Sequence, residues 1–437
     1  MSTKNYSKEL QTLTRNYFLI SFCITLVNSL PGVILSLFLI DQFDYAFAGI
    51  LFSIMAFSQF IFDYPTGALS DYIGQKRVEI LAILIYSPSI LLLGIANSKI
   101  SFIIIMILLG LGNALFSGVV QTWFSNNYDY LIPQDLDEDR NIYGSIMARI
   151  RSYTFLTVAF SVFIGATIST IFSRNFVFIL NGILGFFLII VIIVLLNDFY
   201  DQEKQEKASL QTHVKNYLKI TFKSINIVST DYLLLSTIIG ILLITASLGP
   251  VFIQLIYFPV VFGYTGTDSF IGISQFVIYL VLAINIFLIG IYARKFNRQY
   301  MVVFFIFYVL FFTNSLLILL HVISPTMSLN LPALVFIVLI YLFFDSFIGE
   351  IAVNLQQRIF LDLIPSAFRN SILSLYSSLM AVIVAIYYFT VGLVIQKYDL
   401  DGGIVFMEIT GIAGCIFLLP TLFSHRLKNS NKTKIVK

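Results

Sequence analysis

The sequence predicts an all-α integral membrane protein with twelve transmembrane helices. Hydrophobic residues make up 58% of the 437 residues and charged residues only 11%, whereas a soluble domain holds about 45–50% apolar and about 25% charged residues. Many apolar stretches reach the length of about 20 residues that a membrane-spanning helix needs. They are much longer than the strands of a membrane barrel, so helices are expected.

Each apolar stretch is assigned as one helix, in two sets of six. The first set is Asn16–Ile40, Tyr45–Leu69, Val78–Ala96, Ile100–Phe124, Gly144–Phe172 and Asn175–Leu196. The second set is Leu233–Phe258, Phe270–Tyr292, Met301–His321, Leu331–Val353, Ile372–Ile395 and Ile404–Phe423. The expected domains are therefore an N-terminal bundle (1–196), a central loop (197–231) and a C-terminal bundle with a basic tail (232–437).

The distribution of basic residues predicts the orientation. With the N-terminus in the cytoplasm, 23 of the 26 Lys and Arg residues fall on the cytoplasmic side, and Lys99, Arg174 and Lys397 fall on the other. Cytoplasmic loops are enriched in basic residues, so both termini are expected in the cytoplasm of a multi-pass protein of the cell membrane. The polar N-terminus lacks the pattern of a signal peptide. Lysines spaced by four in the central loop fit either a helix on an anionic membrane surface or a solvated linker.

The two halves share a short pattern. The fourth helix contains FSGVVQTWFSNNYDYLIP and the tenth contains FIGEIAVNLQQRIFLDLIP, so each opens with Phe-x-Gly and closes with Leu-Ile-Pro. The match falls on the same helix of each half. It supports two six-helix pseudo-repeats in parallel orientation.

A polar loop motif joins the second and third helices. It consists of Gly67, Asp71, Gly74, Lys76 and Arg77. A glycine permits a sharp turn, and the two bases favour the cytoplasmic side. The motif resembles the helix 2–3 loop of major facilitator superfamily transporters, and the resemblance covers the whole chain. It implies the twelve-helix fold of that family and transport by alternating access.

The resemblance also implies a role for Asp71. In the family this acid meets the N-terminus of helix 11 and closes the cytoplasmic side; here that terminus carries Ser366, a possible N-cap, and Arg369. The alternative is a loop that only sets the topology. The preceding Asp63-Tyr-Pro-Thr-Gly67 resembles a less characterised subgroup with an acidic-x-Pro-Thr-Gly sequence before the loop.

Proton coupling is assigned to acids inside the membrane helices, because such groups are costly in lipid and face the bundle interior. Ser346, Glu350 and Asn354 share one face of the tenth helix. Glu350 is therefore the preferred proton carrier, and Asp345 and Asp63 are the other two candidates. The alternative is a structural glutamate that is hydrogen-bonded between helices.

Polar residues on the helices that line the cavity in the family are the candidates for solute contact. They are Asn28, Asn113, Ser117, Gln121, Gln254, Tyr257, Gln275, Tyr279, Ser346 and Asn354. Small polar groups also serve helix packing in membranes, and that alternative stays open for each of them.

The sequence therefore predicts a secondary active transporter. We expect proton-coupled efflux of a small, neutral or cationic, partly apolar solute, because the polar stripes hold no Arg or Lys clamp. The alternative is a sensor, lipid-handling or assembly protein that keeps the scaffold and no longer transports.

The expected partners are the solute, protons and membrane lipids, and we expect a monomer without nucleic acid. The chain holds no phosphate-loop or nucleophile motif, so no enzyme activity is expected. Its two cysteines lie in apolar stretches, so no metal or cofactor is expected either.

Overall fold

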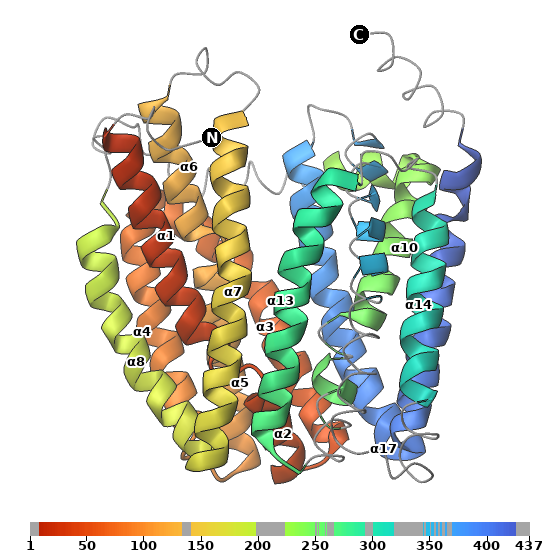
Figure 1. Ribbon diagram of the computed structural model, residues 1–437, viewed down its shortest axis with the longest axis horizontal. Coiled ribbons are helices and arrows are strands. Elements are labelled where there is room, and N and C mark those ends of the chain that lie inside the picture. Colours follow the sequence, from red (N-terminus) through yellow and green to blue (C-terminus); the bar gives the residue numbers. More distant parts are fainter. Residues whose placement is uncertain are drawn as a thin grey trace. The chain divides into compact units, whose positions relative to one another are not determined.

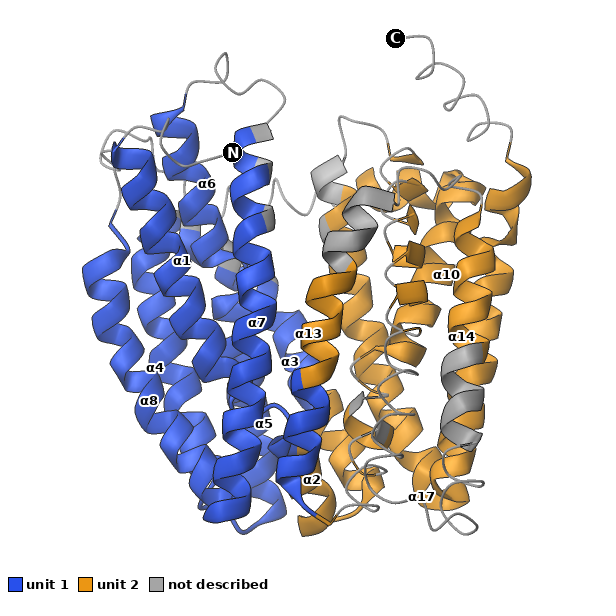
Figure 2. Cartoon of the chain, in the orientation of Figure 1, with its two compact units in different colours: residues 1–35, 54–216, 267–276 blue, residues 36–53, 217–266, 277–437 orange. Residues whose placement is uncertain are grey.

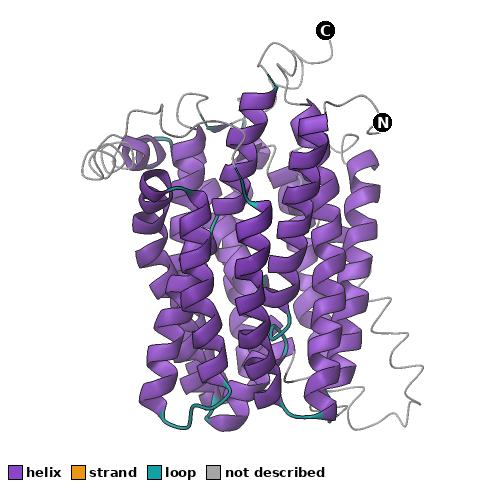
Figure 3. Ribbon diagram, turned by 90° about the vertical axis from the view of Figure 1, so that its left-hand side faces the viewer, coloured by secondary structure: helices purple, strands orange, loops and turns teal. Residues whose placement is uncertain are grey.

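A computed structural model describes most of the chain, and all structural statements concern the residues that it describes. These are residues 8–132, 141–197, 223–249, 251, 253–257, 259, 266–292, 300–318, 344, 347–349, 351–353, 355–356, 359–360, 363–364 and 369–424. Helices dominate them, and these residues contain no strand (Figure 3). The predicted all-α class is confirmed.

The described helices are shown in chain order by their colours (Figure 1). They are α1 (Lys8–Ser29), α2 (Ile34–Gln42), α3 (Tyr45–Ile73), α4 (Gln75–Leu93), α5 (Lys99–Phe116), α6 (Val119–Leu131), α7 (Asn141–Ile171), α8 (Arg174–Leu195), α10 (Tyr232–Leu248), η4 (Ile253–Tyr257), α13 (Asp268–Tyr292), α14 (Met301–Ile318) and α17 (Arg369–Phe423).

Among these residues, seven helices are long and apolar enough to cross a membrane, or eight if one bent pair counts as a span. The bent pair is Lys223–Thr230 with Tyr232–Leu248. Two expected spans, the eleventh and twelfth, form α17, which is non-helical at Tyr398 and Asp399. Most of the tenth expected span lies outside the described residues. The chain is a multi-pass membrane protein.

Contacts divide the chain into two compact units (Figure 2). Unit 1 comprises residues 1–35, 54–216 and 267–276, and unit 2 comprises residues 36–53, 217–266 and 277–437. Each unit thus includes a short segment from the opposite half of the sequence. The predicted boundaries around a loop of residues 197–231 stay a prediction.

The core of unit 1 lies where α1, α4, α6 and α8 meet. Its buried members include Tyr17, Ile83, Trp123 and Ile192. Small residues let two of these helices approach closely, as is usual in membranes. On α8, a Cβ at Gly182 would stand 2.5 Å from the Leu91 Cβ of α4.

Helices α1 and α7 pack side by side in unit 1 (Figure 1). Phe18 contacts Tyr153 edge to face, with ring centroids 5.2 Å apart. Further along, the Ser161 hydroxyl donates a hydrogen bond to the Leu26 carbonyl, 135 residues away in the chain. The two pairs have the same sequence separation, so the helices run parallel and in register.

In unit 2, glycines bring two pairs of segments together. A Cβ on Gly240 of α10 would lie 2.7 Å from the Gly414 carbonyl oxygen of α17. A Cβ on Gly49, near the start of α3, would lie 2.5 Å from the Tyr388 carbonyl oxygen and 3.1 Å from the Gly392 Cα. These contacts attach the first turns of α3 to α17 within unit 2.

Candidate functional site

A helix break in unit 1 lies beside a proline of the neighbouring helix. The fourth expected span is broken between α5 and α6, where Gly118 has a φ of 72°, which a glycine adopts without strain. Helix α3 is continuous but contains Pro65, and a proline removes a backbone donor from a helix. The Thr66 hydroxyl links α3 to the end of α5, since it lies 3.0 Å from the Asp63 carbonyl and 3.1 Å from the Ala114 carbonyl.

Close packing holds α3 in this position. The Ser58 hydroxyl donates to the Ile107 carbonyl at 2.8 Å. A Cβ on Gly110 would stand 2.5 Å from the Met55 carbonyl oxygen, so no larger residue fits on α5 without moving α3. The sequence Asp63-Tyr-Pro-Thr-Gly67 therefore has a structural meaning: its threonine attaches α3 to the end of α5.

The interruption creates a polar site on the exposed face of unit 1. The Ser117 hydroxyl is a hydrogen-bond partner of the Asp63 carboxylate, and both residues are exposed. Gln121 is also exposed, one turn further along α6. The N-terminus of α6 begins at Gly118 without a side-chain cap. Its free N–H groups give a partial positive charge beside the acid and the amide, so the site offers both donors and acceptors to a polar group.

The first helix is interrupted too, between α1 and α2 at Pro31. The Val27 carbonyl accepts a hydrogen bond from the Leu30 backbone N–H at 3.3 Å and another from the Asn181 side-chain nitrogen at 2.6 Å. Asn28 is half-buried, and its side-chain oxygen has no hydrogen-bond partner in the described part of the chain. Helix α7 approaches this break so closely that a Cβ on Gly165 would overlap the Leu30 carbonyl oxygen.

The loop motif of the sequence forms the junction between α3 and α4. Gly74 stands between them with a φ of 90°, a conformation that favours glycine. The Lys76 ammonium donates to the Ile193 carbonyl at 2.7 Å and to the Asn197 side-chain oxygen at 2.8 Å. It therefore ties the motif to the end of α8, whereas Arg77 is exposed.

The predicted latch involves side chains outside the described set. Asp71 and Gly67 lie in α3, but the placement of the Asp71 side chain is not described, nor is that of the Arg369 side chain. Ser366 lies outside the described residues altogether. The latch between Asp71 and the start of helix 11 stays a prediction.

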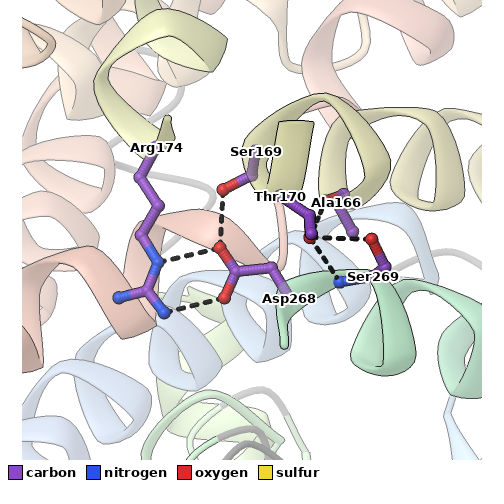
Figure 4. A network of polar contacts seen from close by, with 6 residues as sticks. All are labelled: Ala166, Ser169, Thr170, Arg174, Asp268 and Ser269. Atoms are coloured by element: carbon purple, nitrogen blue, oxygen red, sulfur yellow. Dashed lines mark hydrogen bonds and ion pairs between the residues drawn. The ribbon is translucent and has the colours of Figure 1, made fainter. Parts of the chain in front are cut away.

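A charged network attaches the start of α13 to α7 and α8 within unit 1 (Figure 4). Arg174 binds Asp268 through two hydrogen bonds, from Nε at 2.9 Å and from Nη2 at 2.7 Å. The Ser169 hydroxyl donates to the same carboxylate at 2.5 Å. Beside it, the Ser269 backbone N–H donates to the Thr170 hydroxyl at 2.9 Å.

Apolar contacts continue this attachment along α7. A Cβ on Gly272 would stand 2.5 Å from the Ala166 Cβ. One turn further, Phe276 contacts Phe160 with ring centroids 5.1 Å apart. The first turns of α13 therefore contact the last turns of α7 through one continuous stripe, which ends in the buried ion pair.

Unit 2 brings one predicted cavity residue into a specific contact. The Tyr388 hydroxyl on α17 donates to the Gln254 side-chain oxygen at 2.7 Å, and the Tyr388 ring stacks on Phe52 with centroids 5.0 Å apart. Gln254 and Tyr257 lie in η4, a π-helical turn. Such turns occur frequently at functional sites.

The remaining predicted residues differ in placement. Gln275 is 4% exposed, Tyr279 and Asn113 are half-buried, and the side chain of Tyr257 is not described. Glu350, Asp345, Ser346 and Asn354 lie outside the described residues. The structure thus brings Asp63 and Ser117 together, and it leaves the expected tenth-helix stripe untested.

The sequence analysis missed Glu79, which is 0% exposed on α4. Neither carboxyl oxygen has a hydrogen-bond partner in the described part of the chain. The one charged residue of α8 is Arg174 and that of α5 is Lys99, each at the far end from Glu79. An acid at the start of an apolar stretch, two residues after the base Arg77, was the available sequence signal. Burial of an unpaired acid is costly, and such acids mark functional sites in membrane helices.

No metal centre is found in the part of the chain that the structure describes, since it holds no group of three His, Cys, Asp or Glu residues near one another.

The sequence from residue 17 to residue 387 matches the family model of the Major Facilitator Superfamily. The chain belongs to this superfamily. No curated protein matches its sequence.

Solved structures of other proteins have a similar fold. The nucleoside transporter NupG is similar with a TM-score of 0.64 and 12% identity, over 95% of this chain and 99% of that one. A D-xylose-proton symporter is similar with a TM-score of 0.62 and 12% identity, over 94% and 96%. The human organic anion transporter MFSD10 is similar with a TM-score of 0.55 and 14% identity, over 94% and 100%. At these identities the likeness shows the fold alone.

Proposed function

We propose that this superfamily member is a secondary active transporter that moves a small, partly apolar solute by alternating access. The proposal includes proton coupling and the direction of export. Family membership and the fold support transport of a small molecule. The class of solute, the direction of transport and the coupling ion are proposed here.

The observation that carries it is the exposed site of Asp63, Ser117 and Gln121 beside the break between α5 and α6. Discontinuous helices with free backbone groups form the solute and ion sites of many secondary transporters. Here the break at Gly118 separates α5 from α6, and Thr66 of the neighbouring α3 contacts the end of α5. Without this break, no free backbone donors would be available at this level.

Asp63 is the best-placed proton site in the described part of the chain. It is exposed and paired with the Ser117 hydroxyl, so a proton or a solute cation can reach it. Glu79 is buried and unpaired and is the second candidate. Glu350 and Asp345 remain candidates from the sequence.

Purified protein in proteoliposomes tests the proposal with a panel of nucleosides, sugars and lipophilic cations. We expect uptake of one class to follow an imposed proton gradient and to collapse with an uncoupler. Asp63→Asn should keep exchange of solute down its own gradient and lose accumulation against it, because the shape survives and the proton site does not. Glu350→Gln is the parallel variant for the predicted acid.

The variants separate the candidates. Accumulation retained in Asp63→Asn and lost in Glu350→Gln would move the coupling site to the tenth helix. The absence of flux for every solute class, together with specific ligand binding, would instead support a sensor or an assembly protein on the same scaffold.

A further inference from the structure

A groove between α1 and α7 in unit 1 has the features of a ligand site. It has a volume of about 470 Å³, within the usual range of roughly 300–1,000 Å³ for small-molecule pockets. Its walls carry the polar side chains of Gln11, Thr14, Arg15, Ser145 and Arg149 and the apolar or aromatic side chains of Phe18, Ile146, Ile150 and Tyr153.

The groove lies near the N-terminal ends of the two helices, far along the chain from the close contact of Gly165 with Leu30. The register defined by Phe18 with Tyr153 places Arg15 level with Ile150, and it places Arg149 level with Thr14. The two arginines therefore stand on opposite rims, about 1.5 Å apart in height along the parallel helices.

Both guanidinium groups are available for a ligand. Arg15 and Arg149 are exposed, and neither has an ion-pair or hydrogen-bond partner among the described residues. Helix α7 carries no acidic residue, and the acid of α1 is Glu9. Glu9 does not line the groove, and Arg15 and Arg149 are the charged residues among the described residues that line it.

The floor of the groove is apolar. Ile146 and Ile150 are buried in the core of the unit, at 7% and 6% exposure, and the edge-to-face pair of Phe18 and Tyr153 closes one end. An arginine pair presents forked donors that match phosphate or carboxylate oxygens, and the floor accepts hydrocarbon. The complementary ligand has an anionic head and an apolar body.

We propose that this groove binds an amphiphilic anion, with a phosphate or carboxylate group between Arg15 and Arg149 and its apolar part against Phe18 and Tyr153. Two sources have this chemistry: an anionic phospholipid of the leaflet on the N-terminal side, and a free organic anion. Basic pockets between membrane helices on the cytoplasmic side bind phospholipid head groups in this way. The inference does not depend on transport, because it concerns binding alone.

The test measures binding to the purified full chain in a nonionic detergent. Trp123 is the one tryptophan and is 0% exposed, so its fluorescence reports unfolding of unit 1. Phosphatidylglycerol should raise the melting temperature in a saturable manner, and phosphatidylcholine with the same chains should not. Phenyl phosphate and phenol are the matched pair that tests a free anion: phenyl phosphate should raise the melting temperature if a soluble anion binds, and phenol should not.

Arg15→Gln and Arg149→Gln should each weaken the apparent affinity at least about tenfold, the effect of one lost charged hydrogen bond. Arg151→Gln is the matched control, because Arg151 is exposed on the same helix and does not line the groove. Saturation by phosphatidylglycerol alone identifies a lipid site, and saturation by phenyl phosphate alone identifies a solute site. Saturation by neither anion, or equal weakening in Arg151→Gln, would overturn the proposal.

Discussion

At the residue scale, Glu79 is the least satisfied charged group in the described part of the chain. Its carboxyl is fully buried on α4 and without a hydrogen-bond partner there. A buried polar group without a partner costs about 1–3 kcal/mol. A residue that destabilises its own helix bundle in this way is expected to contribute to function, since stability and activity often compete.

Replacement of Glu79 by leucine tests this cost. Glu79→Leu should stabilise unit 1 by about 1–3 kcal/mol, because it removes the unmade hydrogen bonds and adds apolar contact. Glu79→Gln is the matched control and should give little gain, since its amide is equally unpaired. Thermal unfolding followed by Trp123 fluorescence measures both variants. A leucine variant less stable than the natural chain would show that the carboxyl has a stabilising partner.

At the scale of elements, glycines decide how the interrupted helices pack. Gly165 and Gly118 both lie in unit 1, and each position requires a glycine for a different reason. A Cβ on Gly165 would overlap the Leu30 carbonyl, whereas nothing lies within 4 Å of a Cβ on Gly118, whose need for glycine comes from its φ of 72°.

Gly118→Ala should therefore cost only about 1–2 kcal/mol, the strain of an alanine in the left-handed region. Gly165→Ala should cost more, because a rigid backbone carbonyl must move and overpacking commonly costs about 1–3 kcal/mol or above. Denaturation of the two variants in the same detergent gives the comparison. Equal stability of the two would indicate that α7 shifts freely along α1.

The attachment of α13 to α7 and α8 depends on the Arg174–Asp268 ion pair, which joins α13 to the start of α8. The two side chains are 14% and 7% exposed, so loss of one partner leaves a largely buried charge. Asp268→Asn should destabilise this attachment by about 3 kcal/mol, the lower end for breaking a buried pair. Hydrogen exchange at residues 268–276 should then accelerate.

A double-mutant cycle isolates the pair. Arg174→Gln combined with Asp268→Asn should cost less than the two single changes added together, because neither charge is left unpaired. Strict additivity would mean that the two side chains do not interact in the folded protein.

At the scale of the whole molecule, the membrane orientation is still a prediction from the basic residues. A reporter fused after Ser430 and another inserted in residues 197–231 should both report the cytoplasm, and one after Lys99 should report the outside. These expectations follow from the enrichment of Lys and Arg in cytoplasmic loops. Disagreement between the first two reporters would exclude two bundles in parallel orientation.

The sequence by itself determined the membrane class, the helical fold and the family. These properties depend on residues that are close together in the sequence. The apolar stretches are long enough to cross a membrane, and the loop motif lies within residues 67–77. The turn at Gly74 was predicted in this way, and the structure confirms it. The expected fourth helix had the correct position, although its break beside Ser117 was not predicted.

Only the tertiary structure decided which polar groups meet. Asp63 and Ser117 lie on different helices, and Arg174 and Asp268 are 94 residues apart. Arg149 and Arg151 are two residues apart in the sequence, but of these two only Arg149 lines the groove between α1 and α7. The physical reason is that hydropathy and charge are local properties. The partner of a side chain, by contrast, depends on the rotation and register of packed helices, which the whole bundle fixes at once.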